Sequence, residues 1–238
     1  MKEKVSDGSV LELLRRFLDQ DVMERMKRWT PIAGTPQGSV ISPLMSNLYL
    51  HGLDERLSAA DCKYVRFADD FVALCRTRHE AEAVLAEIQA WVQQHGLRLH
   101  PKKTRVGHCL EPGQGFEFLG YRFEGTRRYV RPKSLAALKD TIRQNTPRMR
   151  SGSLATIIAD LNPTLTGWFE YFKHADPRTF RSLDGFVRRR LRAVLRARRK
   201  RPGQGHSRAD HQRWPNAFFA AHGLFTLHEA WCAARQSR

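Results

Sequence analysis

Residues 63–75 read KYVRFADDFVALC, two short apolar arms around the adjacent acids Asp69 and Asp70. Both arms are rich in β-branched and aromatic residues, and the small and acidic residues between them favour a turn. The pattern predicts a β-hairpin with two carboxylates at its tip. Like charges side by side are unfavourable unless a cation offsets them, and hard divalent ions with oxygen ligands serve that purpose. A solvated acidic turn is the alternative, and these residues alone do not choose between the two.

The charge of the chain is divided unevenly. Residues 1–100 hold 13 Lys/Arg against 14 Asp/Glu, and residues 101–238 hold 28 against 10, so the whole net charge of +17 lies in the C-terminal part. Such an asymmetry indicates a polyanionic partner, most often nucleic acid. An anionic membrane surface is the competing explanation. It is weakened because the basic residues are interspersed with aromatic residues over several segments.

The 238 residues suffice for one large domain or two small ones with a buried core. The four cysteines, Cys62, Cys75, Cys109 and Cys232, show no paired metal-ligand spacing. This argues for a reducing compartment and against a disulfide framework or a zinc module. The sequence shows no signal peptide and no apolar run long enough to cross a bilayer. We therefore expect a soluble, cytoplasmic protein with no membrane partner.

Hydrophobic periodicity predicts the order of the elements. In the first half, it predicts helices over residues 9–29, 42–57 and 79–95, an extended segment over 97–106, and a second hairpin over 115–131. The helix from Ser42 has a hydroxyl cap and a proline at its first position, and Gly96 ends the next helix as a left-handed cap. Beyond Pro132 the pattern predicts helices over about 133–145, 153–173, 178–200 and 226–235. The fold class is therefore α+β, divided near Pro132.

Three further stretches could carry chemistry, and each has a plain structural alternative. The loop Gly34–Ser39 has a fixed bend and glycines that allow close approach of a ligand, or it is an ordinary loop before a helix. Lys102–Arg105 ends a basic segment that could neutralise phosphate, or it is solvated. Phe116–Tyr121 alternates like a strand followed by glycine, which ordinary core packing also explains.

Taken in order, these stretches resemble the reverse transcriptases encoded by group II introns. The resemblance rests on Gly34–Ser39 with Ser42–Leu44, Phe67–Asp70, Gly96–Thr104 and Phe118–Gly120. Toward the C-terminus, the resemblance extends to the thumb or maturase region of that family, at Leu161–Pro163, Gly167–Phe172 and Trp214–Phe219. Four motifs in the right order are far more specific than any one of them.

The resemblance implies a partial polymerase palm of antiparallel hairpins and packed helices over residues 1–131. A helical, RNA-binding thumb/maturase domain would follow over 132–238. The implied activity is RNA-directed DNA polymerisation by two-metal nucleotidyl transfer, with one Mg²⁺ activating the primer 3′-hydroxyl and the other holding the triphosphate. The implied partners are RNA, group II intron RNA in particular, a DNA primer and deoxynucleoside triphosphates.

The resemblance also assigns roles to particular residues. Asp69 and Asp70 would be catalytic metal ligands, and Lys103 a general acid toward pyrophosphate. The pocket for the incoming nucleotide would be lined by Pro36, Gln37 and Gly38. The primer terminus would be supported by Phe118, Leu119 and Gly120.

The sequence departs from the family pattern in two places. Phe67 stands where the family more often has tyrosine. A third catalytic acid of the family lies on an earlier palm strand, and Asp7, Asp19 and Asp21 match no such motif. We therefore expect the fingers and one metal ligand to be absent, the two-ion site to be incomplete, and this chain alone to polymerise poorly or not at all.

The predicted helix over 178–200 carries dense positive charge beside apolar residues. Its candidate RNA-binding residues are Arg188, Arg189, Arg192, Arg196, Arg199 and Lys200. Repulsion among like charges costs stability, so a bound polyanion explains this density better than solubility does. The alternative function is a non-catalytic, maturase-like protein that binds intron RNA and assists splicing. A basic DNA-binding structural protein would explain the charge but not the ordered motifs.

Overall fold

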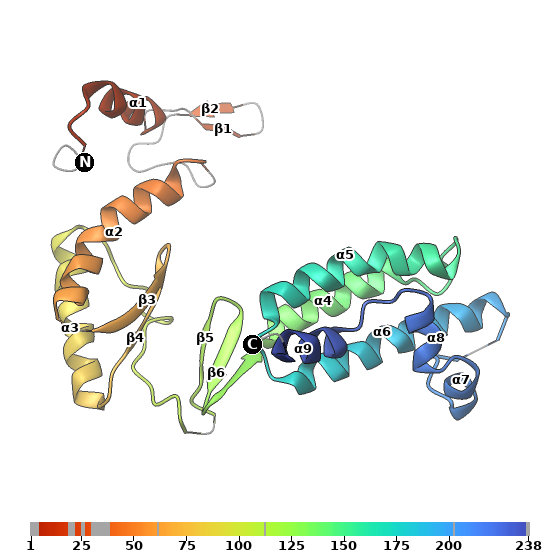
Figure 1. Cartoon of the computed structure of the whole chain (residues 1–238). Helices are drawn as coiled ribbons and strands as arrows, with labels where there is room; N and C mark the ends of the chain where they lie inside the picture. Colours follow the sequence, from red (N-terminus) through yellow and green to blue (C-terminus); the bar gives the residue numbers. More distant parts are fainter. Residues whose placement is uncertain are drawn as a thin grey trace. The chain divides into compact units, whose positions relative to one another are not determined.

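The computed structural model describes residues 5–18, 22–24, 27–29, 39–60, 62–111, 113–201 and 203–236. The chain divides into two compact units, unit 1 over Met1–Val106 and unit 2 over Gly107–Arg238 (Figure 1). Unit 1 contains α1 (Gly8–Leu18), β1 (Val22–Glu24), β2 (Lys27–Trp29), α2 (Ser42–Ala59), β3 (Lys63–Phe67), β4 (Asp70–Leu74) and α3 (Arg78–Gln94). The described elements are mixed helices and small antiparallel sheets, which confirms the α+β class.

The elements of unit 2 are a small sheet followed by helices. They are β5 (Phe116–Phe118), β6 (Tyr121–Glu124), β7 (Arg127–Val130), α4 (Pro132–Asn145), α5 (Leu154–Phe172), α6 (Pro177–Arg198), α7 (Arg208–Arg213), α8 (Asn216–Ala221) and α9 (Leu227–Gln236). No helix among the described residues combines the length and apolar character that a membrane span needs.

Helices α2 and α3 and the β3–β4 hairpin of unit 1 share a small core. Its buried side chains are Leu53, Leu57, Ile88, Trp91 and Val92. The α3 helix begins where the Thr77 side chain accepts a hydrogen bond from the Glu80 amide. It ends before Gly96, whose φ of +67° confirms the predicted left-handed cap. The core therefore fixes β3 and β4 against α2 and α3.

Two predictions for unit 1 are wrong. The helix expected over residues 9–29 ends at Leu18, and Val22–Glu24 pairs with Lys27–Trp29 as an antiparallel hairpin. The segment 97–106 forms no strand, because the amides of Lys103 and Thr104 both donate to the carbonyl of His100 and close a turn. A third detail differs: Ser42 is the first residue of α2, and Ile41 stands at the cap.

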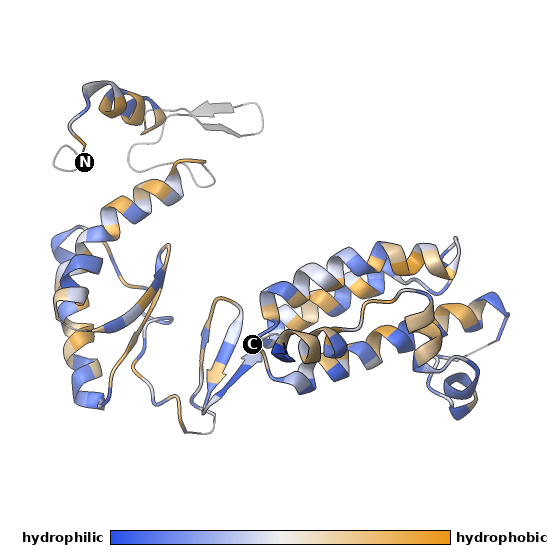
Figure 2. Ribbon diagram, viewed as in Figure 1, coloured by the Kyte–Doolittle hydropathy of each residue, from blue (hydrophilic) through white to orange (hydrophobic). Residues whose placement is uncertain are grey.

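The core of unit 2 is formed mainly by side chains of its helices, together with Val130 of β7. In α6 the fully buried Phe180 lies edge-on to Phe169 of α5, with ring centroids 5.5 Å apart. Hydrophobic and hydrophilic stretches alternate along α6, as an amphipathic helix requires (Figure 2). The predicted helices over 133–145, 153–173, 178–200 and 226–235 are confirmed within three residues at each end.

Two features of unit 2 differ from the sequence expectation. Residues 115–131 form three strands rather than one hairpin, with Gly125 at the second turn at a φ of +60°. The segment between the predicted helices 178–200 and 226–235 contains α7, which begins at a capping box formed by Ser207 and Asp210. The compact units divide at residue 106, and the functional boundary near Pro132 stays a prediction.

Candidate functional site

The predicted acidic hairpin is present in unit 1. Strands β3 and β4 pair in antiparallel register, with Phe67 opposite Asp70, so Ala68 and Asp69 form a two-residue turn. Ala68 has a φ of +54°, a backbone conformation that residues other than glycine rarely adopt. Both aspartates are exposed to solvent. The structure thus presents two carboxylates at the tip of a tight, strained turn.

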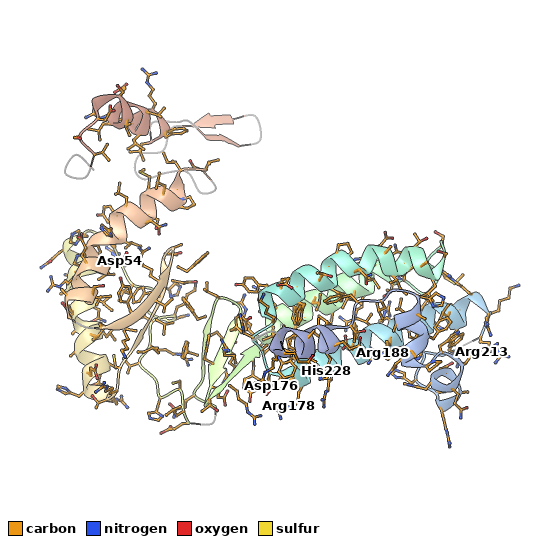
Figure 3. All side chains as sticks on the ribbon, in the orientation of Figure 1. Asp54, Asp176, Arg178, Arg188, Arg213 and His228 are labelled. Carbon is orange, nitrogen blue, oxygen red and sulfur yellow. The ribbon has the colours of Figure 1, made fainter. Side chains whose placement is uncertain are left out.

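The strained turn is held by an arginine on the preceding strand. Arg66 donates from Nη1 to the carbonyl of Ala68 (2.8 Å) and to Oδ1 of Asn47 (2.9 Å). Its Nε donates to Oδ1 of Asp54 (2.8 Å), and Nη2 pairs with the second oxygen of the same carboxylate. The Arg66 side chain is only 12% exposed. Helix α2, which carries Asn47 and Asp54, therefore fixes the turn through one guanidinium group. Asp54 is labelled in Figure 3.

We predict that Asp54→Asn destabilises unit 1 by about 1.5–3 kcal/mol at pH 7, because it leaves the Arg66 guanidinium without its charged partner. Hydrogen bonds from Arg66 lower the pKa of Asp54 below its ordinary value. A carboxyl group whose pKa is lower in the folded state stabilises the fold above its unfolded pKa of about 3.9, and loses that contribution as the pH falls.

Urea unfolding at pH 7, 5 and 3 measures this effect. The difference between wild type and Asp54→Asn should shrink as the pH falls, and Glu55→Gln, an exposed carboxylate on the same helix, should change little. A difference that stays constant with pH would contradict the ion pair as its cause.

The two aspartates are candidate ligands for Mg²⁺, and this assignment stays a prediction. Mg²⁺ prefers oxygen ligands and is often bound by one or two carboxylates together with substrate phosphates. The exposed pair fits that donor set. Within the described residues, no cluster of three or more His, Cys, Asp or Glu side chains is placed to hold a metal ion. Metal binding by Asp69 and Asp70 therefore remains a prediction.

The other predicted residues of the polymerase site lie as follows. Lys103 is exposed in the turn after α3, and its backbone amide donates to the carbonyl of His100. Pro36, Gln37 and Gly38 lie outside the described residues. The structure therefore leaves the predicted grouping of Lys103 and Gln37 with the aspartates as a prediction.

The predicted primer-support residues form a tight turn in unit 2. Phe118 pairs with Tyr121, and the two residues between them, Leu119 and Gly120, have φ values of +48° and +79°. Positive φ at both central positions is the signature of a type I′ turn. The hydroxyl of Tyr171 on α5 donates to the Leu119 carbonyl (2.9 Å).

Close packing also restricts this turn. A Cβ atom on Gly120 would lie 3.2 Å from the Phe172 ring, so glycine is required both by its φ and by the space. The turn Leu119–Gly120 is therefore fixed to the C-terminal end of α5. Its proposed role at a primer terminus stays a prediction.

The arginines of α6 divide between protein contacts and solvent. Arg192 is buried, and donates to the Trp214 carbonyl (2.9 Å) and to Oδ1 of Asn216 (3.0 Å). Arg190 donates to the Thr146 hydroxyl (3.1 Å). Arg188 and Arg189 are half-buried, whereas Arg199 and Lys200 are exposed. Some of these positively charged side chains therefore make hydrogen bonds within unit 2, and others are exposed to solvent.

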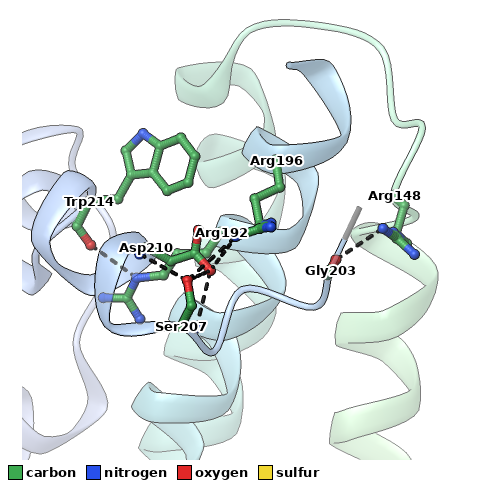
Figure 4. Close-up of polar contacts among 7 residues, drawn as sticks. All are labelled: Arg148, Arg192, Arg196, Gly203, Ser207, Asp210 and Trp214. Atoms are coloured by element: carbon green, nitrogen blue, oxygen red, sulfur yellow. Dashed lines mark hydrogen bonds and ion pairs between the residues drawn. The ribbon is translucent and has the colours of Figure 1, made fainter. Parts of the chain in front are cut away.

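Arg196 fixes the loop that follows α6. Its Nη1 lies 2.7 and 2.9 Å from the two carboxylate oxygens of Asp210, and Asp210 also accepts from the Ser207 hydroxyl (2.7 Å) (Figure 4). Earlier in the same loop, the Gly203 carbonyl accepts a hydrogen bond from Arg148 (2.9 Å). These bonds attach the loop before α7 to the rest of unit 2.

Sequence reasoning missed the residues that support the candidate sites. Asp54 and Asn47 lie 12 and 19 positions before Arg66, and no local sequence pattern links either residue to it. For Asp210, the sequence contains a signal for a helix start, because Ser207 three positions earlier forms a capping box with it.

The sequence matches two family descriptions in order. Residues 5–123 match the family described as reverse transcriptase (RNA-dependent DNA polymerase), and residues 135–214 match the maturase-specific domain of group II introns. The predicted boundary near Pro132 falls between the two matched ranges.

Individual proteins are similar to parts of the chain. Group II intron-encoded protein LtrA of Lactococcus lactis subsp. cremoris is 35% identical over 114 residues, covering 48% of this chain and 16% of LtrA. An uncharacterised 91 kDa protein in the cob intron of Schizosaccharomyces pombe is 24% identical over 165 residues, covering 44% of this chain and 20% of that protein.

Protein YkfC of Escherichia coli (strain K12) is 26% identical over 194 residues, covering 66% of this chain and 49% of YkfC. The chain therefore spans about half or less of the length of these relatives. The reverse transcriptase match covers half of the chain, and the maturase match follows it in the expected order. The chain belongs to the reverse transcriptase family, as a group II intron-type reverse transcriptase/maturase.

Proposed function

We propose that this chain takes part in RNA-directed DNA synthesis, with Asp69 and Asp70 as the metal-binding carboxylates and unit 2 as an RNA-binding region. The observation that carries the proposal is the acidic turn held by Arg66 within the residues that match the reverse transcriptase family. The finer statements, including two Mg²⁺ ions, a DNA primer, nucleoside triphosphates, group II intron RNA and a cytoplasmic location, are part of this proposal.

The chemistry follows from the carboxylate pair. When bound, Mg²⁺ would lower the charge on the triphosphate and increase the acidity of the primer hydroxyl. Asp69 and Asp70 would hold the ion by their oxygens, and the bond between Arg66 and the Ala68 carbonyl would limit movement of the turn. Lys103 would donate a proton to the pyrophosphate leaving group.

A second candidate function is RNA binding without synthesis, as in a maturase. It is favoured by the match to the maturase-specific domain and by the basic charge of residues 101–238. One preparation of the chain, assayed for RNA binding and for extension of a DNA primer on an RNA template with Mg²⁺, distinguishes the two. Extension supports the first candidate, and tight binding with no extension supports the second. A preparation that shows no RNA binding and no primer extension would contradict both candidates.

We predict that RNA binding weakens steeply as salt is added. If about six phosphates of a single-stranded RNA are contacted, the logarithm of the affinity falls with the logarithm of salt concentration at a slope near −4, since each contact releases a condensed counterion. Fluorescence anisotropy with a labelled RNA oligonucleotide from about 50 to 200 mM KCl measures the slope. An affinity independent of salt would exclude an electrostatic interface.

A further inference from the structure

A concave site of about 270 Å³ lies in unit 2 between α6 and the segment from the loop before α7 to the start of α8. Eight residues line it, and two of them are glycines. The other six are Arg188, Arg189, Arg192, His206, His211 and Asn216. None of the eight is acidic, so the lining is strongly basic.

The wall of this basic pocket is built by close packing. Gly205, in the loop before α7, has a φ of +78°, and a Cβ atom there would lie 2.8 Å from the carbonyl oxygen of Arg189. The loop backbone therefore lies directly on α6. Nη1 of Arg189 is 3.3 Å from Nε2 of His206, and the Arg196–Asp210 ion pair holds the same loop. The pocket is thus a fixed feature of the fold.

The positive charges at the pocket are paired mainly with neutral groups. Arg192 is 2% exposed, and its hydrogen bonds go to a carbonyl and to an amide oxygen. Burial, together with repulsion from Arg188 one helical turn away, lowers the pKa of Arg192. An anion in the pocket would relieve this repulsion.

The carboxylates closest to these arginines make other contacts. Asp210 lies within 2.9 Å of Arg196 through both oxygens. Asp184, one turn before Arg188, accepts the amide hydrogens of Leu227 and His228, each at 3.0 Å. Its charge acts on Arg188 at longer range. A ligand is therefore the better source of negative charge at the pocket.

We propose that this pocket binds a phosphate group of an RNA strand, with Arg188 and Arg189 as its direct partners. The inference rests on the RNA binding proposed above and gives that binding a defined place. Guanidinium groups match phosphate oxygens through two parallel N–H bonds, and buried Arg192 adds a fixed positive charge. Gly185 is exposed and has no side chain, so a strand can approach the backbone of α6 closely there.

Gly185 offers a direct test. It lies within α6 and lines the pocket, and a Cβ atom placed on it meets no atom within 4 Å. Gly185→Glu therefore adds a carboxylate to the pocket without a clash, and it removes a residue that weakens helices. Gly185→Gln has the same size and no charge. Gly167→Glu adds the same charge at an open glycine on α5, outside the pocket.

The four proteins are compared by anisotropy with a labelled single-stranded RNA oligonucleotide, after circular dichroism has confirmed equal folding. We expect Gly185→Glu to weaken binding about tenfold or more, because it opposes the phosphate and occupies its place. Gly185→Gln should weaken it less, and Gly167→Glu less than about twofold. Equal effects of the two glutamate variants would overturn the pocket and leave general RNA binding intact.

A second pair of variants removes charge instead. Arg188→Gln should reduce the salt slope by about 0.7, the value expected for one lost phosphate contact of a single strand. Arg181→Gln, on the same helix seven residues earlier and outside the pocket lining, should leave the slope unchanged. If both variants change the slope equally, the site is overturned. A wild-type chain that binds no RNA would overturn the proposed RNA binding itself.

Discussion

Replacing Phe180 by alanine is expected to destabilise unit 2 by about 3–5 kcal/mol. The ring is fully buried in α6 and lies edge-on to Phe169 (5.5 Å) and Trp168 (6.4 Å) on α5. Truncation loses the transfer free energy of the ring and leaves a cavity that the two aromatic neighbours cannot fill. The packing of α6 against α5 would weaken with it.

Chemical denaturation followed by tryptophan fluorescence measures the loss, since Trp168 is beside the cavity. Met149→Ala, at a side chain that is 86% exposed in the same unit, should change the stability by less than about 0.5 kcal/mol. Similar losses in the two variants would contradict the placement of Phe180 in the core.

Local patterns in the sequence were sufficient for the hairpin and the long helices. The β-branched and aromatic residues on either side of Asp69 and Asp70 predicted the two strands, and their register follows from the two-residue turn. Gly96 marked a helix cap, because positive φ is inexpensive only for glycine. These features depend on residues close together in the chain.

Features that depend on distant partners could not be predicted. Val22 continued the helical periodicity of residues 9–18, yet its backbone pairs with Trp29 in a strand. Arg192 was grouped with the surface arginines, but its bond to the Trp214 carbonyl, 22 residues away, buries it. A periodic pattern shows which side of a helix is basic, and only the fold shows which guanidinium groups its loops cover.

Asp69→Asn is expected to reduce RNA-templated DNA synthesis by more than about 100-fold, because a neutral amide is a poor ligand for Mg²⁺. The turn itself should survive. The bond from Arg66 to the Ala68 carbonyl does not involve the Asp69 side chain, which is exposed. Loss of synthesis with unchanged stability would thus locate the effect in the chemistry.

Extension of a DNA primer on an RNA template, with Mg²⁺ and deoxynucleoside triphosphates, tests the central claim most directly. Glu82→Gln removes one exposed negative charge from the same unit and serves as the matched control. We predict slow, magnesium-dependent extension by the wild-type chain and by Glu82→Gln, and none by Asp69→Asn. Extension by Asp69→Asn at the wild-type rate would contradict a catalytic role for the acidic turn. Tight RNA binding by a wild-type chain that never extends the primer would support the non-catalytic candidate instead.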